Sequence, residues 1–138
     1  MTKLIFYKAK EGLFLDKVIG FLDNGKYSHV EIVLEEAQTY WTCVAGSARD
    51  GGVRVNRIYK SDKWDCVVVQ DEVVKDIKNY LGQKYDWPGL IRTFVDWFPA
   101  VKGRWVCSTF AAEIFGLKDP KSYGVQDFYE WARSREKD

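Results

Sequence analysis

Residues 27–44, YSHVEIVLEEAQTYWTCV, contain the pattern that decides the fold. Two segments rich in β-branched and aromatic residues, 27–34 and 39–44, are separated by the polar tetrapeptide EEAQ. Short runs of this kind, joined by a polar connection, predict a β-hairpin. The only histidine of the chain, His29, lies in the first of these two strands.

Further strand patterns surround the hairpin. Residues 3–8 (KLIFYK) predict a first strand, and the turn sequence Asp-Gly-Gly at 50–52 precedes an alternating segment at 53–58. The run WDCVVVQ at 64–70 is more continuously apolar, which predicts a central strand.

Helical spacing of apolar residues is found mainly in the second half of the chain. It predicts helices over residues 13–22, 71–82, 87–97, 106–115 and 125–133. We therefore expect an α+β fold in which an antiparallel sheet of about five to six strands packs against helices. The length of 138 residues predicts a single domain, 1–138.

Composition and charge exclude several classes of protein. The chain has 21 Lys and Arg against 20 Asp and Glu, a net charge of +1, with both signs interspersed. A nucleic-acid-binding protein or a polybasic membrane-surface protein would show a basic patch, so neither is expected. The longest mostly apolar stretch, 87–101, contains Arg92, Asp96 and two prolines, so no transmembrane segment is expected.

The three cysteines, Cys43, Cys66 and Cys107, are widely spaced and form no CxxC pair. An odd, scattered set does not predict a disulfide framework, and it favours a reducing compartment. The first residues lack the pattern of a signal peptide. The expected location is therefore the cytoplasm.

Cys107 differs from the other two cysteines in its position. It lies in the first turn of the predicted helix 106–115, where free N–H groups and the helix dipole favour a thiolate. It also lies on the apolar stripe of that helix, so a small core cysteine is an equally good interpretation. Cys43 and Cys66 fall inside predicted strands, and we expect both to be core residues.

Strand alternation places His29 on a polar face with Tyr27, Glu31 and Val33. The simpler interpretation is a half-exposed histidine on a solvated face. A cysteine at a helix start with a histidine on a neighbouring strand is, however, the papain-type arrangement for attack on an acyl carbon. No cofactor is implied, and a zinc site is not expected because the chain has no paired Cys or His spacing.

Three short motifs together carry a resemblance. Residues 27–33 (YSHVEIV), 82–86 (GQKYD) and 106–110 (VCSTF) resemble the circularly permuted NlpC-like papain-fold superfamily of cysteine peptidases and amidases. Its permuted members have the histidine strand first, a G-x-x-Y-D element next and the cysteine helix last, an order that is inverted in ordinary NlpC-type peptidases. The segment RDGGVR at 49–54 is similar to bacteriophage-encoded relatives.

The resemblance implies a set of catalytic roles. Cys107 would be the nucleophile, His29 the general base, and Tyr85 an oxyanion donor or substrate contact. The third residue of the family lies on the strand after the histidine, and a hairpin turning at residues 36–37 would place Thr42 there. Threonine departs from the usual His, Asn, Gln or acid, so Glu31 is the alternative orienting residue. Tyr85 also fits a plain role in the loop before a helix that Asp86 would cap.

Three functions follow as alternatives. The first is a thiol hydrolase acting on an amide bond, in a peptide or in the peptide stem of the cell wall, located in a host cytoplasm or a virion if phage-encoded. The second is a lipid acyltransferase or thioesterase that uses the same Cys-His pair, as in lecithin–retinol acyltransferase-like proteins. The third is a catalytically silent binding or virion-associated module of the same fold, with its many aromatic residues lining a groove.

Overall fold

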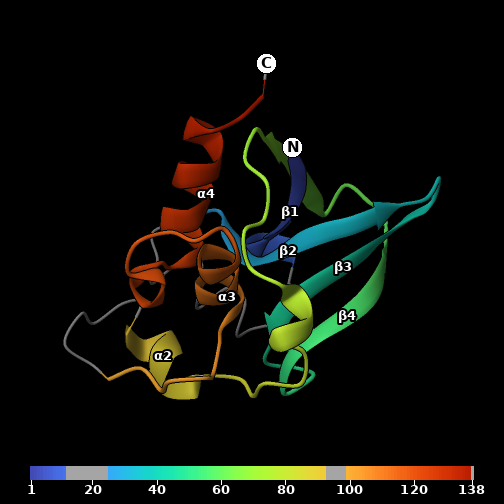
Figure 1. The fold of residues 1–138 in the computed structure, drawn as a ribbon. Helices are drawn as coiled ribbons and strands as arrows, with labels where there is room; N and C mark the ends of the chain where they lie inside the picture. Colours follow the sequence, from blue (N-terminus) through green and yellow to red (C-terminus); the bar gives the residue numbers. More distant parts are fainter. Residues whose placement is uncertain (12–24, 93–98, 138) are drawn as a thin grey trace.

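The computed structural model describes residues 1–11, 25–92 and 99–137, and within these ranges five strands form one antiparallel sheet (Figure 1). Three α-helices and three short 3-10 helices complete this part of the chain, so the predicted α+β class is confirmed. The elements are β1 (Thr2–Lys8), η1 (Ala9–Glu11), β2 (Tyr27–Glu36), β3 (Tyr40–Ser47), β4 (Gly52–Tyr59), β5 (Trp64–Val69), η2 (Ile77–Asn79), α2 (Trp87–Arg92), α3 (Cys107–Ile114), η3 (Pro120–Ser122) and α4 (Val125–Ser134).

The strand order in the sheet is β4-β3-β2-β1-β5. The predicted hairpin is confirmed as β2–β3, but the prediction that 64–70 forms a central strand is wrong. Strand β5 is an edge strand that pairs with β1 only. Its apolar residues Val67 and Val69 are buried in the main core, and residues near the chain end lie along its outer side: the Lys137 N–H donates to the Val68 carbonyl at 2.7 Å.

The main core lies between one face of the sheet and helices α3 and α4, which both pack on that face (Figure 1). The side chains at its centre are fully buried, and they come from strands and helices alike: Leu4, Phe6, Val30, Ile32, Val44, Phe110, Ile114 and Phe128. A smaller cluster of Ile5, Trp41 and Cys43 occupies the other face of the sheet. Helices α3 and α4 confirm the predicted helices 106–115 and 125–133.

An irregularity in the β1–β2 pairing changes the predicted alternation. The register shifts between Tyr7, which pairs with His29, and Lys8, which pairs with Tyr27. The extra residue of this bulge turns Tyr27 away from the face of His29 and into the main core, where its ring lies 5.4 Å from that of Phe6. The prediction that Tyr27 shares a polar face with His29 is therefore wrong.

The segment 71–82 is not the predicted helix and contains only the 3-10 turn η2, with Asp76 as its cap. Its apolar residues still contact the core, because Val73, Ile77 and Tyr80 pack against it from an irregular backbone. Helix α2 confirms the start of the predicted helix 87–97. Residues 93–97, like the predicted helix 13–22, lie outside the described residues.

Candidate active site

Helix α3 begins at Cys107, where the prediction placed a helix start. The hydroxyl of Thr109 accepts a hydrogen bond from the backbone N–H of Val106 at 3.0 Å, which ties the residue before the helix to its first turn. Gly46 of β3 lies directly beneath, and a Cβ there would be 3.1 Å from the carbonyl carbon of Val106. A glycine at this point therefore allows the helix start to approach the sheet closely.

The three cysteines differ in their environment. Cys107 is 6% exposed and belongs to the edge of the main core. Cys43 is buried, as predicted, and its burial raises the pKa of its thiol to about 12. The expectation that Cys66 is a core residue is wrong: it is exposed, because β5 is an edge strand, although partial burial of its thiol still raises its pKa.

His29 lies on β2 close to the start of α3, so the structure brings the two predicted residues together. Burial opposes protonation of its ring. The negative charges of Cys107 and of Glu31, with hydrogen bonds to both, outweigh that effect and raise the pKa of His29 to about 10. The side chain is 22% exposed, so the imidazole is reachable from one side. The ring of Trp64 lies 6.4 Å away, edge to face.

Glu31 lies two residues after His29 on the same strand and face. None of its side chain is exposed, so the expectation of a solvated face is wrong at this position. Its Oε2 lies 2.5 Å from Nε2 of His29. Burial raises the pKa of a carboxyl group, but here the charges and hydrogen bonds of His29 and Arg54 overcome it and lower the pKa of Glu31.

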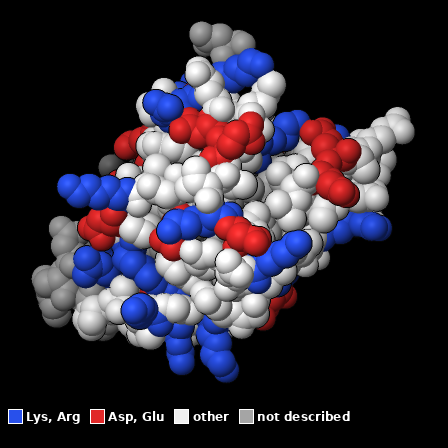
Figure 2. Space-filling view, in the orientation of Figure 1, with Lys and Arg blue, Asp and Glu red and all other residues white. Residues whose placement is uncertain are grey.

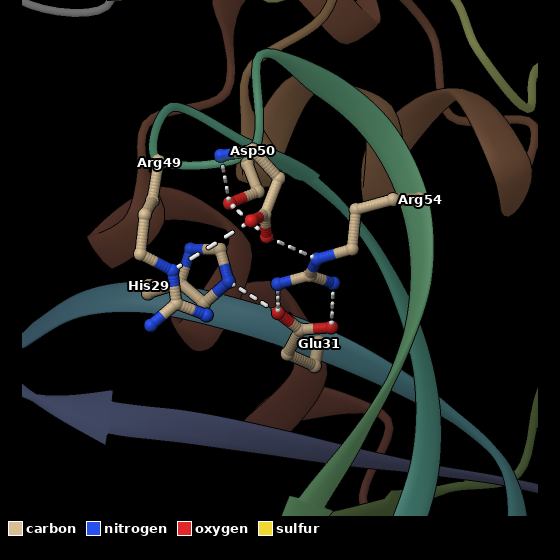
Figure 3. Close-up of polar contacts among 6 residues, drawn as sticks. His29, Glu31, Arg49, Asp50 and Arg54 are labelled. Carbon is tan, nitrogen blue, oxygen red and sulfur yellow. Dashed lines mark hydrogen bonds and ion pairs between the residues drawn. The ribbon is translucent and has the colours of Figure 1, made fainter.

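A pair of arginine hydrogen bonds holds this carboxylate in place. Arg54 of β4 donates from both terminal nitrogens to Glu31, at 2.8 and 2.7 Å (Figure 3). The third donor of the guanidinium, Nε, binds Asp50 at 2.8 Å, and Ser47 also donates to Asp50 at 3.1 Å. These contacts form a row of alternating charges that ends at the Cys107 thiol. Its members are Asp50, Arg54, Glu31 and His29.

Tyr85 is also brought to this site, as the resemblance implied. It is 6% exposed, and burial and the nearby charge of Cys107 both raise the pKa of its hydroxyl. The other prediction for this segment, that Asp86 caps the following helix, is confirmed as well. Asp86 caps α2 by accepting from the N–H of Gly89 at 2.8 Å, and Lys121 lies 3.2 Å from the same carboxylate. Capping of α2 therefore holds Tyr85 in position beside Cys107.

Thr42 does not lie beside His29. The predicted register paired Thr42 with Glu31, but in the structure Thr42 pairs with Glu35, and Ile32 with Val44. The hairpin turn lies later than predicted, and an irregularity between Val33 and Glu35 shifts the pairing further. Thr42 is therefore about 20 Å along the sheet from the level of His29, since each residue of a strand advances about 3.3 Å.

Sequence analysis did not identify Arg54 and Asp50 as parts of the site. Both belong to the segment 49–54, which was noted only for its resemblance to phage proteins. The sequence contains a signal that could identify Arg54: strand alternation places its side chain on one defined face of β4. Arg54 pairs with Ala45 of β3, a side chain small enough to let the arginine cross to β2.

No family model matches this chain, and neither a curated protein nor a solved structure is found to be significantly similar to it. Within the described parts of the chain, no group of three or more His, Cys, Asp and Glu side chains is arranged to hold a metal ion. No helix in those parts is both long enough and apolar enough to cross a membrane.

Proposed function

We propose that the protein is a thiol hydrolase of amide bonds, with Cys107 as the nucleophile, His29 as the general base and Glu31 as the residue that orients the base. The observation that carries this proposal is the position of His29, between the thiol at the start of α3 and a buried carboxylate. A third group that orients the base is the arrangement that activated nucleophiles require. Arg54 is a positioning residue, because it acts on His29 only through Glu31.

In this proposal the two ring nitrogens of His29 have different roles. Since Glu31 holds Nε2, Nδ1 is the nitrogen that takes the thiol proton. The thiolate attacks the carbonyl carbon, a C–S bond forms, and the imidazolium gives its proton to the departing amine as the C–N bond breaks. Water, deprotonated by the same imidazole, then attacks the thioester and releases the carboxylate and the free thiol.

Two groups are placed to stabilise the oxyanion of each tetrahedral intermediate. The first N–H groups of a helix have no partner within the helix, and Cys107 is the first residue of α3, so these donors lie at the same end of the helix as the thiol. Tyr85 is buried, and the charge of Cys107 acts on its hydroxyl, which supports Tyr85 as the second group. The resemblance to permuted NlpC-like proteins, and not the geometry, suggests a peptide or the peptide stem of the cell wall as the substrate.

A second candidate, acyl transfer from a lipid by the same Cys-His pair, has one observation in its favour. Trp87 and Ile91 lie one turn apart on α2 and are 51% and 45% exposed. The ring of Trp87 lies 4.8 Å from that of Tyr85, so this apolar surface begins beside the proposed nucleophile. An acyl chain would have a place to lie there.

The proposal is tested by mass spectrometry of the intact protein after incubation with a muropeptide or with a long-chain acyl ester. A covalent acyl adduct on Cys107 from the muropeptide supports the amidase, and an adduct only from the ester supports acyl transfer. The Cys107→Ser variant is the control for the adduct site, and Cys66→Ser is the matched control for an exposed cysteine. An absence of adducts with both substrates, together with equal alkylation of Cys107 and Cys66 by iodoacetamide, contradicts both candidates.

A further inference from the structure

Strand β4 forms one edge of the sheet, and among the described residues only the beginning of that edge is paired with another segment (Figure 1). The Val53 N–H donates to the Gln83 carbonyl at 2.8 Å, and the Gly82 N–H donates to the Val53 carbonyl at 3.0 Å. The pairing is antiparallel, with Gly52 opposite Lys84. The main-chain groups of Val53 therefore point outward, away from β3.

The same outward direction holds for every second residue of the strand. It applies to Val55, Arg57 and Tyr59, because N–H and C=O directions alternate along a strand. The hydrogen bond from the Lys60 N–H to the Thr39 carbonyl, at 3.0 Å, confirms that the even-numbered residues face β3. Among residues 1–11, 25–92 and 99–137, no strand pairs with this outer side beyond Val53.

The side chains along this free edge are exposed. Val55 is 46% and Tyr59 65% exposed, and Arg57 lies between them with its guanidinium over the ring of Tyr40 at 4.2 Å. A long unpaired edge is a place where another extended chain can add as a further strand. The ladder that the segment 82–85 begins can therefore be continued by a second chain.

An open pocket of about 410 Å³ lies at this edge of the sheet. It is lined by Arg49, Asp50, Arg54, Val55 and Asn56. Two of these residues, Asp50 and Arg54, belong to the row of charges that ends at His29. A chain lying along β4 would therefore lie beside the outer end of this row of charges.

The pocket contains one weakly paired cation. Arg49 is 79% exposed, and its guanidinium lies 3.8 Å from Asp50. The same carboxylate is already held by Arg54 at 2.8 Å, so Asp50 neutralises Arg49 only partly. The chain is nearly neutral, and the face shown in Figure 2 has both signs of charge interspersed. A carboxylate in the pocket would give Arg49 a close partner.

We propose that the free edge of β4, from Val55 to Tyr59, binds an extended peptide segment that places an acidic side chain beside Arg49. This inference rests on the proposed function, since it names the substrate class of the same site as a peptide in strand conformation. The peptide bonds through its main chain to the outward groups of β4. Its side chains alternate between the two faces of the sheet, and one on the face of Arg54 and Asn56 enters the pocket.

The test uses the Cys107→Ala protein and the synthetic peptide acetyl-Thr-Val-Glu-Val-Thr-amide, with binding followed by NMR of the backbone amides. We expect the amide signals of Val55, Arg57 and Tyr59 to shift. N-methylation at alternate peptide residues should abolish binding, and N-methylation at the residues between them should not, since only every second peptide N–H faces β4. Binding without this alternation, or shifts confined to other strands, overturns the proposal.

Two protein variants sharpen the test. Val55→Pro removes an outward N–H that β3 does not use, so the sheet tolerates it while peptide binding is lost. Its matched control, Val55→Thr, keeps the N–H and the binding. Arg49→Gln should weaken binding of the Glu peptide about fivefold, the change that corresponds to ~1 kcal/mol, and should not affect a peptide with Gln at that position. Equal loss for both peptides overturns the role of Arg49.

Failure of this inference and failure of the proposed function are distinguishable. If the peptide binds along β4 but Cys107 forms no acyl adduct in the wild-type protein, the edge is a binding surface and the hydrolase proposal fails. If adducts form while Val55→Pro leaves turnover and binding unchanged, the hydrolase stands and the β4 inference fails. Pairing of β4 with a second copy of the chain, seen as a dimer that Val55→Pro dissolves, would also overturn it.

Discussion

Strand β2 carries two glutamates that each bind two basic groups, in opposite surroundings. Glu36, at the end of the strand, accepts hydrogen bonds from Lys3 at 2.5 Å and Lys60 at 2.6 Å, and its side chain is 40% exposed. Glu31 binds one guanidinium and one imidazole over similar distances, but none of its side chain is exposed. The two networks have the same types of contact and differ mainly in access to water.

This difference separates a surface network from the network of the proposed active site. Exposed ion pairs contribute little to stability, since water already solvates the charges. A buried carboxylate loses its hydration, and an apolar side chain of the same volume is often at least as stabilising. Stability alone therefore does not explain why the carboxylate of Glu31 is buried. An anion fixed against Nε2 of His29 does explain it, because it orients the imidazole and favours its protonated form.

The largest expected effect is on stability, when each network loses one cation. Arg54→Met should lower the free energy of unfolding by about 3–5 kcal/mol, because it takes one of two partners away from a buried carboxylate. Lys60→Met should cost no more than about 1 kcal/mol. Urea denaturation measures both. The double variant Arg54→Met with Glu31→Gln should recover part of the loss, and similar small losses in both single variants would contradict the distinction.

The next effect is on the reactivity of Cys107. His29→Gln should slow its alkylation by iodoacetamide at pH 7 by about tenfold or more, because the charge that favours a thiolate is lost. Glu36→Gln, a change in the exposed network, should leave the rate unchanged. Quantitative mass spectrometry follows the reaction, with Cys66 of the same molecule as the internal reference. Identical rates in wild type and His29→Gln would mean that His29 is only a strand residue.

The pH dependence of stability should also separate the networks. The pKa of His29 is raised from 6.5 to about 10, so its contribution is complete below pH 6.5 and is lost as pH rises through about 10. The hydrogen bonds from Lys3 and Lys60 lower the pKa of Glu36 to about 2, so its contribution is present above pH 4.5 and is lost as pH falls towards 2. The difference in free energy of unfolding between wild type and His29→Gln should therefore shrink as pH rises through about 10, and the difference between wild type and Glu36→Gln should shrink as pH falls towards 2. Parallel alkaline curves for wild type and His29→Gln would contradict the shifted pKa.

The smallest expected effect is that of salt. Ions screen exposed charges within about 3 Å at 1 M salt, whereas a buried pair is screened much less. The stability difference between wild type and Glu36→Gln should therefore shrink when sodium chloride is raised from about 0.1 M to about 1 M. The difference between wild type and Arg54→Met should stay nearly constant. Equal shrinkage in both would show that water reaches Glu31 in solution.

Much of the site followed from local patterns. The apolar spacing after Cys107 and the glycine at position 116 predicted helix α3 closely, because both act within a few residues. The same holds for the β2–β3 hairpin and for the capping of α2 by Asp86. Glu31 was identified as an alternative orienting residue because i and i+2 positions of a strand share a face.

The wrong predictions arose where a distant partner overrides a local pattern. The spacing of Val73, Ile77 and Tyr80 suits a helix, yet the Val74 N–H bonds to the Ile114 carbonyl at 2.9 Å and keeps the backbone irregular. A bulge opposite β1 turned Tyr27 into the core. The shifted β2–β3 register moved Thr42 away from His29, since a change in pairing carries every cross-strand neighbour with it.

The sequence by itself determined which chemistry was available: one histidine, one cysteine at the start of a helix, and the strand that carries the histidine. Only the tertiary structure decided that Glu31 is buried, that Arg54 holds it across β3, and that none of the described strands pairs with the edge of β4 beyond Val53. The reason is physical. Helix starts and strand alternation depend on interactions within a few residues, whereas strand order, register and burial depend on the simultaneous packing of segments far apart in the chain.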